Sequence, residues 1–258
     1  MQKLTVSIIQ ANLVWEDVDT NLKAFTKKIQ SIESTDLIVL PETFSTSFSM
    51  NSETLAEPMN GKTMSWMAEI AQNKNAVVAG SAILKENNQI FNRFIWMRPN
   101  GSFEKYDKRH LFRMGNEHNH FTAGKERLIV ELKGWKICPQ ICYDLRFPVW
   151  SRNKKQEYDL LLYVANWPEV RTAAWEKLLY ARAIENQCYV AAVNRIGVDG
   201  EGVNCIGNSM FIDPKGELIW KAADAKEESS TTEIYLDELN DFRKKFPVGM
   251  DADDFEVR

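Results

Sequence analysis

The sequence lacks any long hydrophobic run. No apolar stretch reaches the roughly 18 residues that a membrane-spanning helix needs. The first ten residues, MQKLTVSIIQ, lack the apolar segment of a secretory signal peptide and predict a strand instead. Long basic runs are also missing, and the formal net charge is −4. We therefore expect neither a membrane nor a nucleic acid as a partner.

Cysteine is scarce, and its spacing forms no known framework. The four cysteines are Cys138, Cys142, Cys188 and Cys205, and no two of them make a Cys-x-x-Cys pair. This usage predicts free thiols and a location in the reducing cytoplasm. The sequence also has no G-x-G-x-x-G after its first apolar segment. That absence removes the commonest signature of a dinucleotide-binding sheet.

Strand and helix patterns alternate along the chain, without an internal repeat or a low-complexity linker. Short apolar runs predict strands, and apolar residues at spacings of three and four predict helices. The main strands are expected at 4–10, 36–40, 76–81, 90–97, 103–107, 128–132, 135–141, 159–164, 188–194, 208–212, 218–221 and 232–236, and helices at 17–33, 63–75, 147–156, 171–187 and 237–245, with loops at 113–124 and 196–207.

This pattern predicts a single domain over residues 1–258, of the α/β class. Because hairpins are inserted between paired strands and helices, we expect a four-layer α-β-β-α sandwich with two sheets inside. A single doubly wound sheet is the competing architecture.

Three polar side chains follow predicted strands directly, although they lie far apart in the sequence. Glu42 comes after DLIVLP, Lys108 after FEKYD, and Cys142 after KICPQI. Loops at strand ends are where ligands bind in α/β proteins. Each residue also has an ordinary structural interpretation: a solvated turn for Glu42, a surface cation for Lys108, and a small buried hydrophobe for Cys142.

Together the three residues make a coherent set for acyl transfer. A thiol attacks best as the thiolate, which needs a base and a nearby cation. Glu42 would accept the proton of Cys142 and pass it to a leaving amine. Lys108 and the backbone N–H of Tyr143 would stabilise the oxyanion of a tetrahedral intermediate.

Several stretches resemble the motif blocks of the nitrilase superfamily of carbon–nitrogen hydrolases. These are LPETF, YDKRHLF and CYDLRFPVWSRN, which contain the three residues above, and also HFTAG, YVANWP, ARAIENQCYV and NRIGVDGEG. They occur in order over nearly the whole chain. Within the superfamily, NEHNHFTAG and CYDLRFPVWSRN look most like the omega-amidases, which hydrolyse the terminal amides of 2-oxoglutaramate and 2-oxosuccinamate.

The resemblance implies an α-β-β-α sandwich with a Glu-Lys-Cys triad and no metal or organic cofactor. It also implies a second glutamate between the lysine and the cysteine, which positions the lysine and the substrate amide. Glu117 fits this role best by position, while Glu126 and Glu131 lie in the same interval.

Other side chains suggest how a small substrate would be held. Arg146 and Arg113 are suited to pair with a substrate carboxylate, as a bidentate fork does. Phe44, Tyr143 and Trp167 would wall a narrow slot around a short chain. For Arg146, a structural ion pair within the protein or with a second copy is the equal alternative.

The three histidines offer a competing site. His110, His118 and His120 lie within eleven residues, and such a cluster with a neighbouring carboxylate resembles a zinc site. A papain-like couple of Cys142 with a histidine is also possible on composition. The resemblance favours Glu42 as the base and no metal.

We therefore predict a cytoplasmic thiol amidohydrolase for a short 2-oxo dicarboxylic acid monoamide. An N-carbamoyl-amine amidohydrolase or a nitrilase is the alternative within the superfamily. A zinc hydrolase and a non-catalytic binding protein are the alternatives outside it. A homodimer is expected, with 147–156 and 171–187 at the two-fold face.

Overall fold

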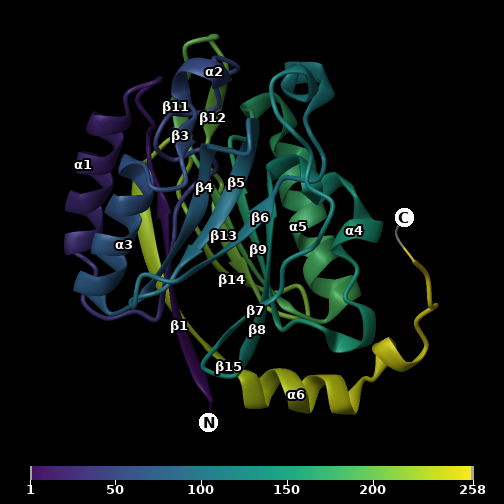
Figure 1. Cartoon of the computed structure of the whole chain (residues 1–258). Coiled ribbons are helices and arrows are strands. Elements are labelled where there is room, and N and C mark those ends of the chain that lie inside the picture. The colour runs from purple at the N-terminus through teal and green to yellow at the C-terminus, as the bar shows by residue number, and fades with distance from the viewer. Residues whose placement is uncertain (1, 257–258) are drawn as a thin grey trace.

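Two β-sheets pack face to face in the centre of the molecule, with helices on both outer sides (Figure 1). The computed structural model describes residues 2–256. The layers run from α1 and α3 through the two sheets to α5 and α4. This arrangement confirms the predicted four-layer α-β-β-α sandwich, and the competing single sheet is wrong.

The first sheet combines the N-terminal strands with the last strand of the chain. Its order is β15 (Glu228–Tyr235), β1 (Lys3–Gln10), β2 (Leu37–Val39), β4 (Val77–Glu86), β5 (Gln89–Met97) and β6 (Phe103–Asp107), and β3 (Glu57–Pro58) pairs with β4. Helices α1 (Val18–Gln30) and α3 (Lys62–Lys74) cover its outer face, while the short α2 (Ser52–Leu55) lies near the strand ends. Phe25, Ile29 and Met67 are among the helical side chains buried under this layer.

The second sheet is built from the middle of the chain. Its order is β14 (Leu218–Lys221), β13 (Met210–Ile212), β10 (Tyr189–Asn194), β9 (Leu160–Ala165), β8 (Trp135–Ile141) and β7 (Val130–Leu132). Strands β8, β9 and β10 are parallel. Every residue of β9 and β10 is buried, as expected for strands covered on both faces, and Lys136 is the one exposed residue of β8. Helix α5 (Thr172–Asn186) packs Trp175, Leu179 and Ala183 against the outer face of this sheet.

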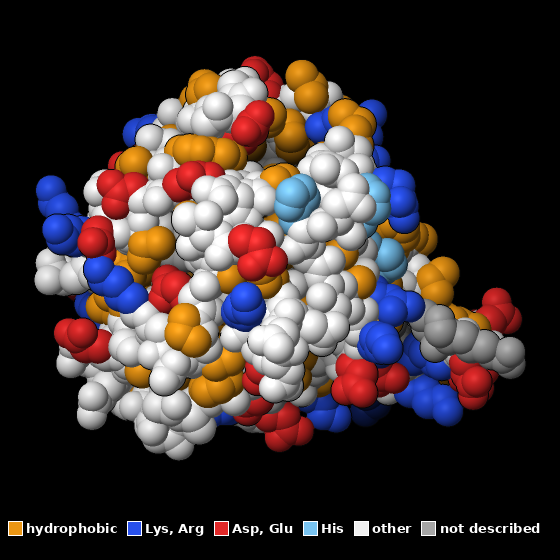
Figure 2. Space-filling view, turned by 45° about the horizontal axis from the view of Figure 1, so that its top comes forward, with side chains coloured by type: hydrophobic (Ala, Val, Ile, Leu, Met, Phe, Trp, Pro, Cys, Tyr) orange, Lys and Arg blue, Asp and Glu red, His pale blue; other side chains and the backbone are white. Residues whose placement is uncertain are grey.

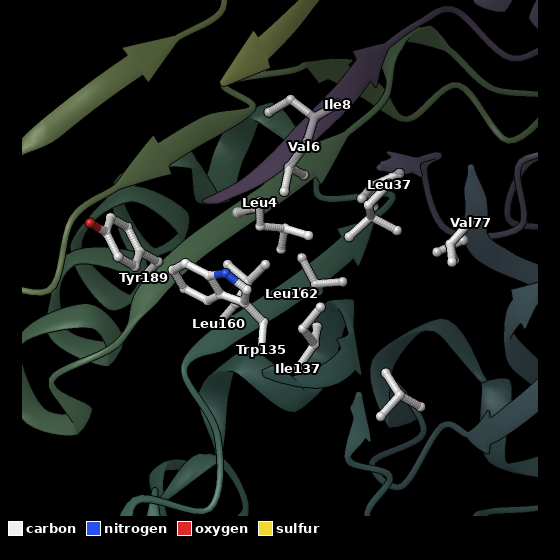
Figure 3. Packing of buried hydrophobic residues seen from close by; sticks show 14 of the residues in the cluster. Leu4, Val6, Ile8, Leu37, Val77, Trp135, Ile137, Leu160, Leu162 and Tyr189 are labelled. Atoms are coloured by element: carbon white, nitrogen blue, oxygen red, sulfur yellow. The ribbon is translucent and has the colours of Figure 1, made fainter. Parts of the chain in front are cut away.

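The core between the sheets consists of the alternate side chains that both sheets turn inward. Leu4, Val6 and Ile8 of β1 face Trp135 of β8 and Leu162 of β9 across this layer (Figure 3). Successive side chains of a strand point to opposite faces, so the remaining apolar residues of β2, β8 and β9 pack under the helices. The two sheets are therefore held together by a closely packed apolar interface.

The segment predicted to be a helix over 147–156 is not one continuous helix. Helix α4 (Pro148–Ser151) begins at Pro148, as expected for proline in a first turn, but it ends after one turn. A 3₁₀ turn (Lys154–Gln156) follows, and Lys155 and Gln156 both have positive φ. The side chain of Asn153 donates to the carbonyl of Tyr158, an alternative to helical bonding.

Other local differences are smaller. The segment 196–207, predicted to be a loop, contains a hairpin of β11 (Ile196–Val198) and β12 (Asn204–Ile206). The final strand starts earlier than predicted, because β15 pairs with β1 along its whole length. Helix α6 (Leu236–Lys245) then closes one end of the sandwich (Figure 1). Within residues 2–256, no helix is long and apolar enough to span a bilayer.

Candidate active site

The three strand exits singled out in the sequence meet at one cavity. Glu42 follows β2 and Lys108 follows β6, both in the first sheet, whereas Cys142 follows β8 in the second sheet. All three line a cavity of about 840 Å³. Its walls also include residues of β12 and the segment before α2, so it lies at the end of the sandwich that is uppermost in Figure 1.

Lys108 lies between two buried carboxylates. Its Nζ is 2.8 Å from Oε1 of Glu42 and 3.0 Å from the carboxylate of Glu117. At most 1% of each of these three side chains is exposed. The ring of Phe48 lies 5.1 Å from the ammonium, a cation–π contact. The structure thus brings Glu117 to the place expected of the second glutamate.

Burial and charge oppose each other in this cluster. Burial lowers the pKa of Lys108, but the carboxylates of Glu117 and Glu42 outweigh it and leave that pKa above its ordinary value. Lys108 is therefore an ammonium. Burial raises the pKa of Glu117, and the charge of Glu42 adds to this effect, while Lys108 opposes it.

Two asparagines that the sequence reasoning missed hold Glu42 in place. Nδ2 of Asn92 donates to Oε1 of Glu42 at 2.7 Å, and the backbone N–H of Asn166 donates to Oε2 at 2.8 Å. Asn166 Nδ2 also donates to the backbone carbonyl of Glu42. The signal for Asn92 was the polar pair Asn92-Arg93 inside an otherwise apolar strand. Asn166 lay within the YVANWP block without an assigned role.

Cys142 occupies a strained backbone position. Its φ is +44°, in the left-handed region that β-carbon sterics disfavour, and it begins a 3₁₀ helix (Cys142–Arg146). The residue is half-buried. Burial raises the pKa of its thiol well above the ordinary value, the charge of Glu42 raises it further, and Lys108 opposes them. A neutral thiol at rest therefore needs a base before it can attack.

Tyr143 follows the cysteine and also lines the cavity. It is the second residue of the 3₁₀ helix, where backbone N–H groups lack acceptors within the helix. Its ring makes edge contacts with Phe112 and Phe147, each at a centroid distance of 5.1 Å. These contacts fix the side chain beside Cys142.

The predicted substrate-binding residues separate into two groups. Arg146 and Trp167 line the cavity, and the guanidinium of Arg146 lies 5.0 Å from the centre of the Trp167 ring. Phe44 is fully buried and packs against Phe25 and Trp66 in the core under α1 and α3. The predicted place of Phe44 in the cavity wall is therefore wrong.

A different arginine occupies the place expected for Arg113. Arg113 is exposed and lies outside the cavity lining, whereas Arg171 is part of it. The guanidinium of Arg171 lies 5.4 Å from the centre of the Phe112 ring. Arg171 stands at the start of α5, and no local sequence pattern indicates that the chain folds back over the cavity there.

The histidines do not assemble a metal site. Their pale-blue side chains lie on one side of the face shown in Figure 2, and His110 stacks on Phe147 with its Nδ1 2.8 Å from Asp144. Among residues 2–256, no group of three or more His, Cys, Asp or Glu side chains is arranged to hold a metal ion. The zinc site predicted as an alternative at His110, His118 and His120 is therefore not formed.

Fold and site together are those of a hydrolase with a buried Glu–Lys pair beside a cysteine. Comparison with known proteins gives the family: the chain belongs to the carbon–nitrogen hydrolases, whose family model matches residues 5–244. It is 46% identical over 257 residues to the omega-amidase YafV of Escherichia coli K12, covering all of both chains. It is 34% identical to the 2-oxoglutaramate amidase of Bacillus subtilis, covering 95% of this chain and 96% of that one.

A solved structure agrees with this assignment. XC1258 of Xanthomonas campestris, a protein of the CN-hydrolase superfamily, is 43% identical and superimposes with a TM-score of 0.97 over the full length of both chains. The chain is therefore an enzyme, an amidase of the nitrilase superfamily similar to the omega-amidases. The family and activity class predicted from the motif blocks are confirmed.

Proposed function

We propose that this enzyme hydrolyses the terminal amide of a short 2-oxo dicarboxylic acid monoamide, such as 2-oxoglutaramate or 2-oxosuccinamate. The products would be the dicarboxylic acid and ammonia. Two relatives of nearly equal length support this substrate class, one an omega-amidase and the other a 2-oxoglutaramate amidase. An arginine and a flat aromatic ring in the cavity provide groups suited to a carboxylate and a short chain.

In the proposed first half-reaction, Glu42 takes the proton of the Cys142 thiol while sulfur bonds to the amide carbon. The carbonyl oxygen becomes an oxyanion, which the Lys108 ammonium and the Tyr143 N–H stabilise. The intermediate then collapses, the carbon–nitrogen bond breaks, and Glu42 gives its proton to the leaving ammonia. A thioester on Cys142 remains.

In the second half-reaction, the same carboxylate acts again as a base. Glu42 takes a proton from water as the water oxygen attacks the thioester carbon. The new oxyanion meets the same two donors, and its collapse releases the acid and regenerates the thiol with the proton from Glu42. Glutamate is suited to both steps because it exchanges one proton with sulfur, nitrogen and oxygen in turn.

The observation that carries this proposal is the placement of the Lys108 ammonium. It lies 2.8 Å from Glu42 and 3.0 Å from Glu117, and it lines the same cavity as Cys142. Two hydrogen bonds to the glutamates leave one N–H of the ammonium for a substrate oxygen. A buried cation beside a neutral thiol suits a reaction in which negative charge moves from sulfur to oxygen.

Arg146 is the proposed partner of the substrate's distal carboxylate. It lies four residues beyond Cys142 in the same 3₁₀ helix, so its distance from the nucleophile is fixed by local backbone. Stacking on Trp167 keeps the planar guanidinium oriented for a bidentate contact. This arrangement would select chains that carry a carboxylate a few bonds from the amide.

We also propose a cytoplasmic location and a dimer. All four cysteines are free, as expected in a reducing compartment. Val149 of α4 and Ile184 of α5 are each 54% exposed, and both lie in the segments expected at a two-fold face. Sedimentation of the wild type and of Ile184→Glu would test the dimer, which the charged side chain should dissociate.

The decisive experiment measures ammonia release from 2-oxoglutaramate by the wild type and by Cys142→Ala. Glutamine, asparagine, an N-carbamoyl amino acid and a nitrile serve as comparison substrates. Fast release from the oxo-amide that falls at least about 10³-fold in the variant supports both the nucleophile and the substrate class. Preference for the N-carbamoyl compound or the nitrile would replace the substrate class, and release that survives Cys142→Ala would overturn the mechanism.

A further inference from the structure

Asn92 occupies the interior of β5, one residue before the ion-paired Arg93, and only 1% of it is exposed. Its Nδ2 is 2.7 Å from Oε1 of Glu42 and 3.2 Å from Oε1 of Glu117. We propose that Asn92 is a positioning residue, which holds the two glutamates on either side of Lys108 and so fixes the base and the oxyanion donor relative to each other.

Two buried carboxylates repel each other in this cluster. Glu42 and Glu117 both approach the same ammonium, and each raises the electrostatic cost of the other. Lys108 alone offers one bond to each of them. The backbone N–H groups of Asn166 and Phe112 bind Oε2 of Glu42 and of Glu117. Asn92 donates to Oε1 of both, which closes a ring of four side chains in the order Glu42, Lys108, Glu117 and Asn92.

The backbone of Asn92 reinforces the same arrangement. Its carbonyl accepts the N–H of Lys108 at 3.0 Å, where the chain leaves β6. One residue therefore contacts all three members of the charged cluster, two through its side chain and one through its main chain. A shift of Asn92 would move the two carboxylates and the lysine together.

The oxygen of the Asn92 side-chain amide supports the same role. Oδ1 of Asn92 is buried without a hydrogen-bond partner. Turning the amide over would place that oxygen against two carboxylates, so only the observed orientation is compatible with the cluster. An unsatisfied buried acceptor destabilises a fold. Its presence here indicates that the two N–H groups are kept for the glutamates and not for the packing of the strand.

This inference rests on the proposed function in one respect, the assignment of Glu42 as the base. If Asn92 is lost, Oε1 of Glu42 keeps only the bond to Lys108, while the backbone N–H of Asn166 still holds Oε2. The carboxylate can then turn about that remaining bond and shift relative to Cys142. A misplacement of about 1 Å in a catalytic group lowers a rate about 10²-fold. The effect should appear in kcat and in the activation of the thiol, with substrate affinity changed much less.

The test compares Asn92→Asp and Asn92→Ala with the wild type, and Asn119→Asp serves as the control for an added charge on an exposed asparagine of the neighbouring loop. Asn92→Asp keeps the shape but replaces the donor with a third carboxylate. We expect kcat for 2-oxoglutaramate to fall about 10²-fold near pH 7.5, with KM within about threefold. The ratio of variant to wild-type kcat should rise as the pH falls, because a protonated carboxyl again donates a hydrogen bond.

A second readout does not depend on amide hydrolysis. Cys142 is alkylated with iodoacetamide across the same pH range, and Asn92→Ala should react about tenfold more slowly than the wild type near neutral pH. If no amide is hydrolysed but alkylation still depends on Asn92, the proposed function fails and this inference stands. Wild-type kcat and alkylation in both variants, a loss of activity in Asn92→Asp that is the same at every pH, or failure of both variants to fold would each overturn it.

Discussion

Asp144 accepts a hydrogen bond of 3.0 Å from the backbone N–H of Ile141, the residue immediately before Cys142. Its other oxygen accepts the backbone N–H of His110 at 3.0 Å. Because His110 follows Lys108 by two positions, a single buried carboxylate connects the turn that carries the cysteine with the segment that carries the lysine. The phenol of Tyr106 completes the set, donating to the same carboxylate at 2.7 Å.

Asp144→Asn should weaken both stability and catalysis. The amide keeps one acceptor but presents its own N–H groups to backbone and phenol donors. We expect the free energy of unfolding in urea to fall by about 2–3 kcal/mol, the usual range for hydrogen bonds to a charged group. At pH 7.5, kcat should decrease more than KM changes. Asp213→Asn is the control, because Asp213 also accepts two backbone N–H groups, but in the turn after β13. Equal effects of the two substitutions on kcat would refute the connection.

Arg146→Met should raise KM for 2-oxoglutaramate about 30-fold, the equivalent of about 2 kcal/mol lost with a charge-assisted contact. The variant should hydrolyse open-chain amides that lack a carboxylate at the wild-type rate. Arg113→Met is the matched control, since Arg113 is exposed outside the cavity and should leave both constants unchanged. Steady-state kinetics with 2-oxoglutaramate and with an amide that lacks a carboxylate tests this assignment of Arg146. A larger effect at Arg113, or an equal loss with the uncharged amide, would contradict the assignment.

Stability should decline in alkaline solution because the fold raises the pKa of every thiol. Burial raises the pKa of Cys138 to about 12 and of Cys205 to about 11, and the pKa values of Cys142 and Cys188 also lie above the ordinary 9.0. Above pH 9 the unfolded chain releases thiol protons that the native protein keeps. The free energy of unfolding then falls by about 1.4 kcal/mol per pH unit for each thiol.

Urea unfolding under reducing conditions between about pH 8 and about pH 11 measures this slope. The contribution is fully present below pH 9 and is lost as the pH rises toward the native pKa values. Cys138→Ala removes one titrating group and should reduce the slope by about 1.4 kcal/mol per pH unit. An unchanged slope in that variant would show that the thiol does not contribute.

Phe44→Ala should act on stability and not on substrate affinity. The ring contacts Phe25 and Trp66 at centroid distances of 5.7 and 5.6 Å, in the core between the first sheet and its helices. Truncation should cost about 3–5 kcal/mol of unfolding free energy. The folded variant, assayed at low temperature, should keep a near-normal KM. A KM raised tenfold with little loss of stability would return Phe44 to the cavity wall.

The sequence revealed the strand exits because their pattern is local. Glu42 follows a continuous apolar run and Cys142 a mostly apolar one. Such runs mark buried strands, and the end of a buried strand is where polar residues can reach a ligand. The four layers could be predicted for the same reason. Alternating apolar residues indicate a half-buried strand, apolar residues at spacings of three and four indicate a helix with one buried face, and a continuous apolar run indicates a fully buried strand.

The sequence predictions that failed are those that depend on contacts between segments far apart in the chain. Asn92 is an ordinary strand residue until β5 is placed beside Glu117, and no local pattern reports that neighbour. Phe44 follows Glu42 by two positions, but the chain turns between them, with Thr43 at φ +42°, and the ring packs in the core and not in the predicted cavity wall. Arg171 enters the cavity only because α5 packs on the second sheet.

The division of the site between two sheets has a mechanical consequence. Glu42 and Lys108 follow strands of one sheet and Cys142 follows a strand of the other, so the apolar layer between the sheets sets the distance between them. Any change that lets the sheets slide, such as a smaller side chain at Val6 or Leu162, alters the gap between sulfur and carboxylate before it unfolds anything. In such a variant, kcat should therefore fall at temperatures where circular dichroism still shows a native protein.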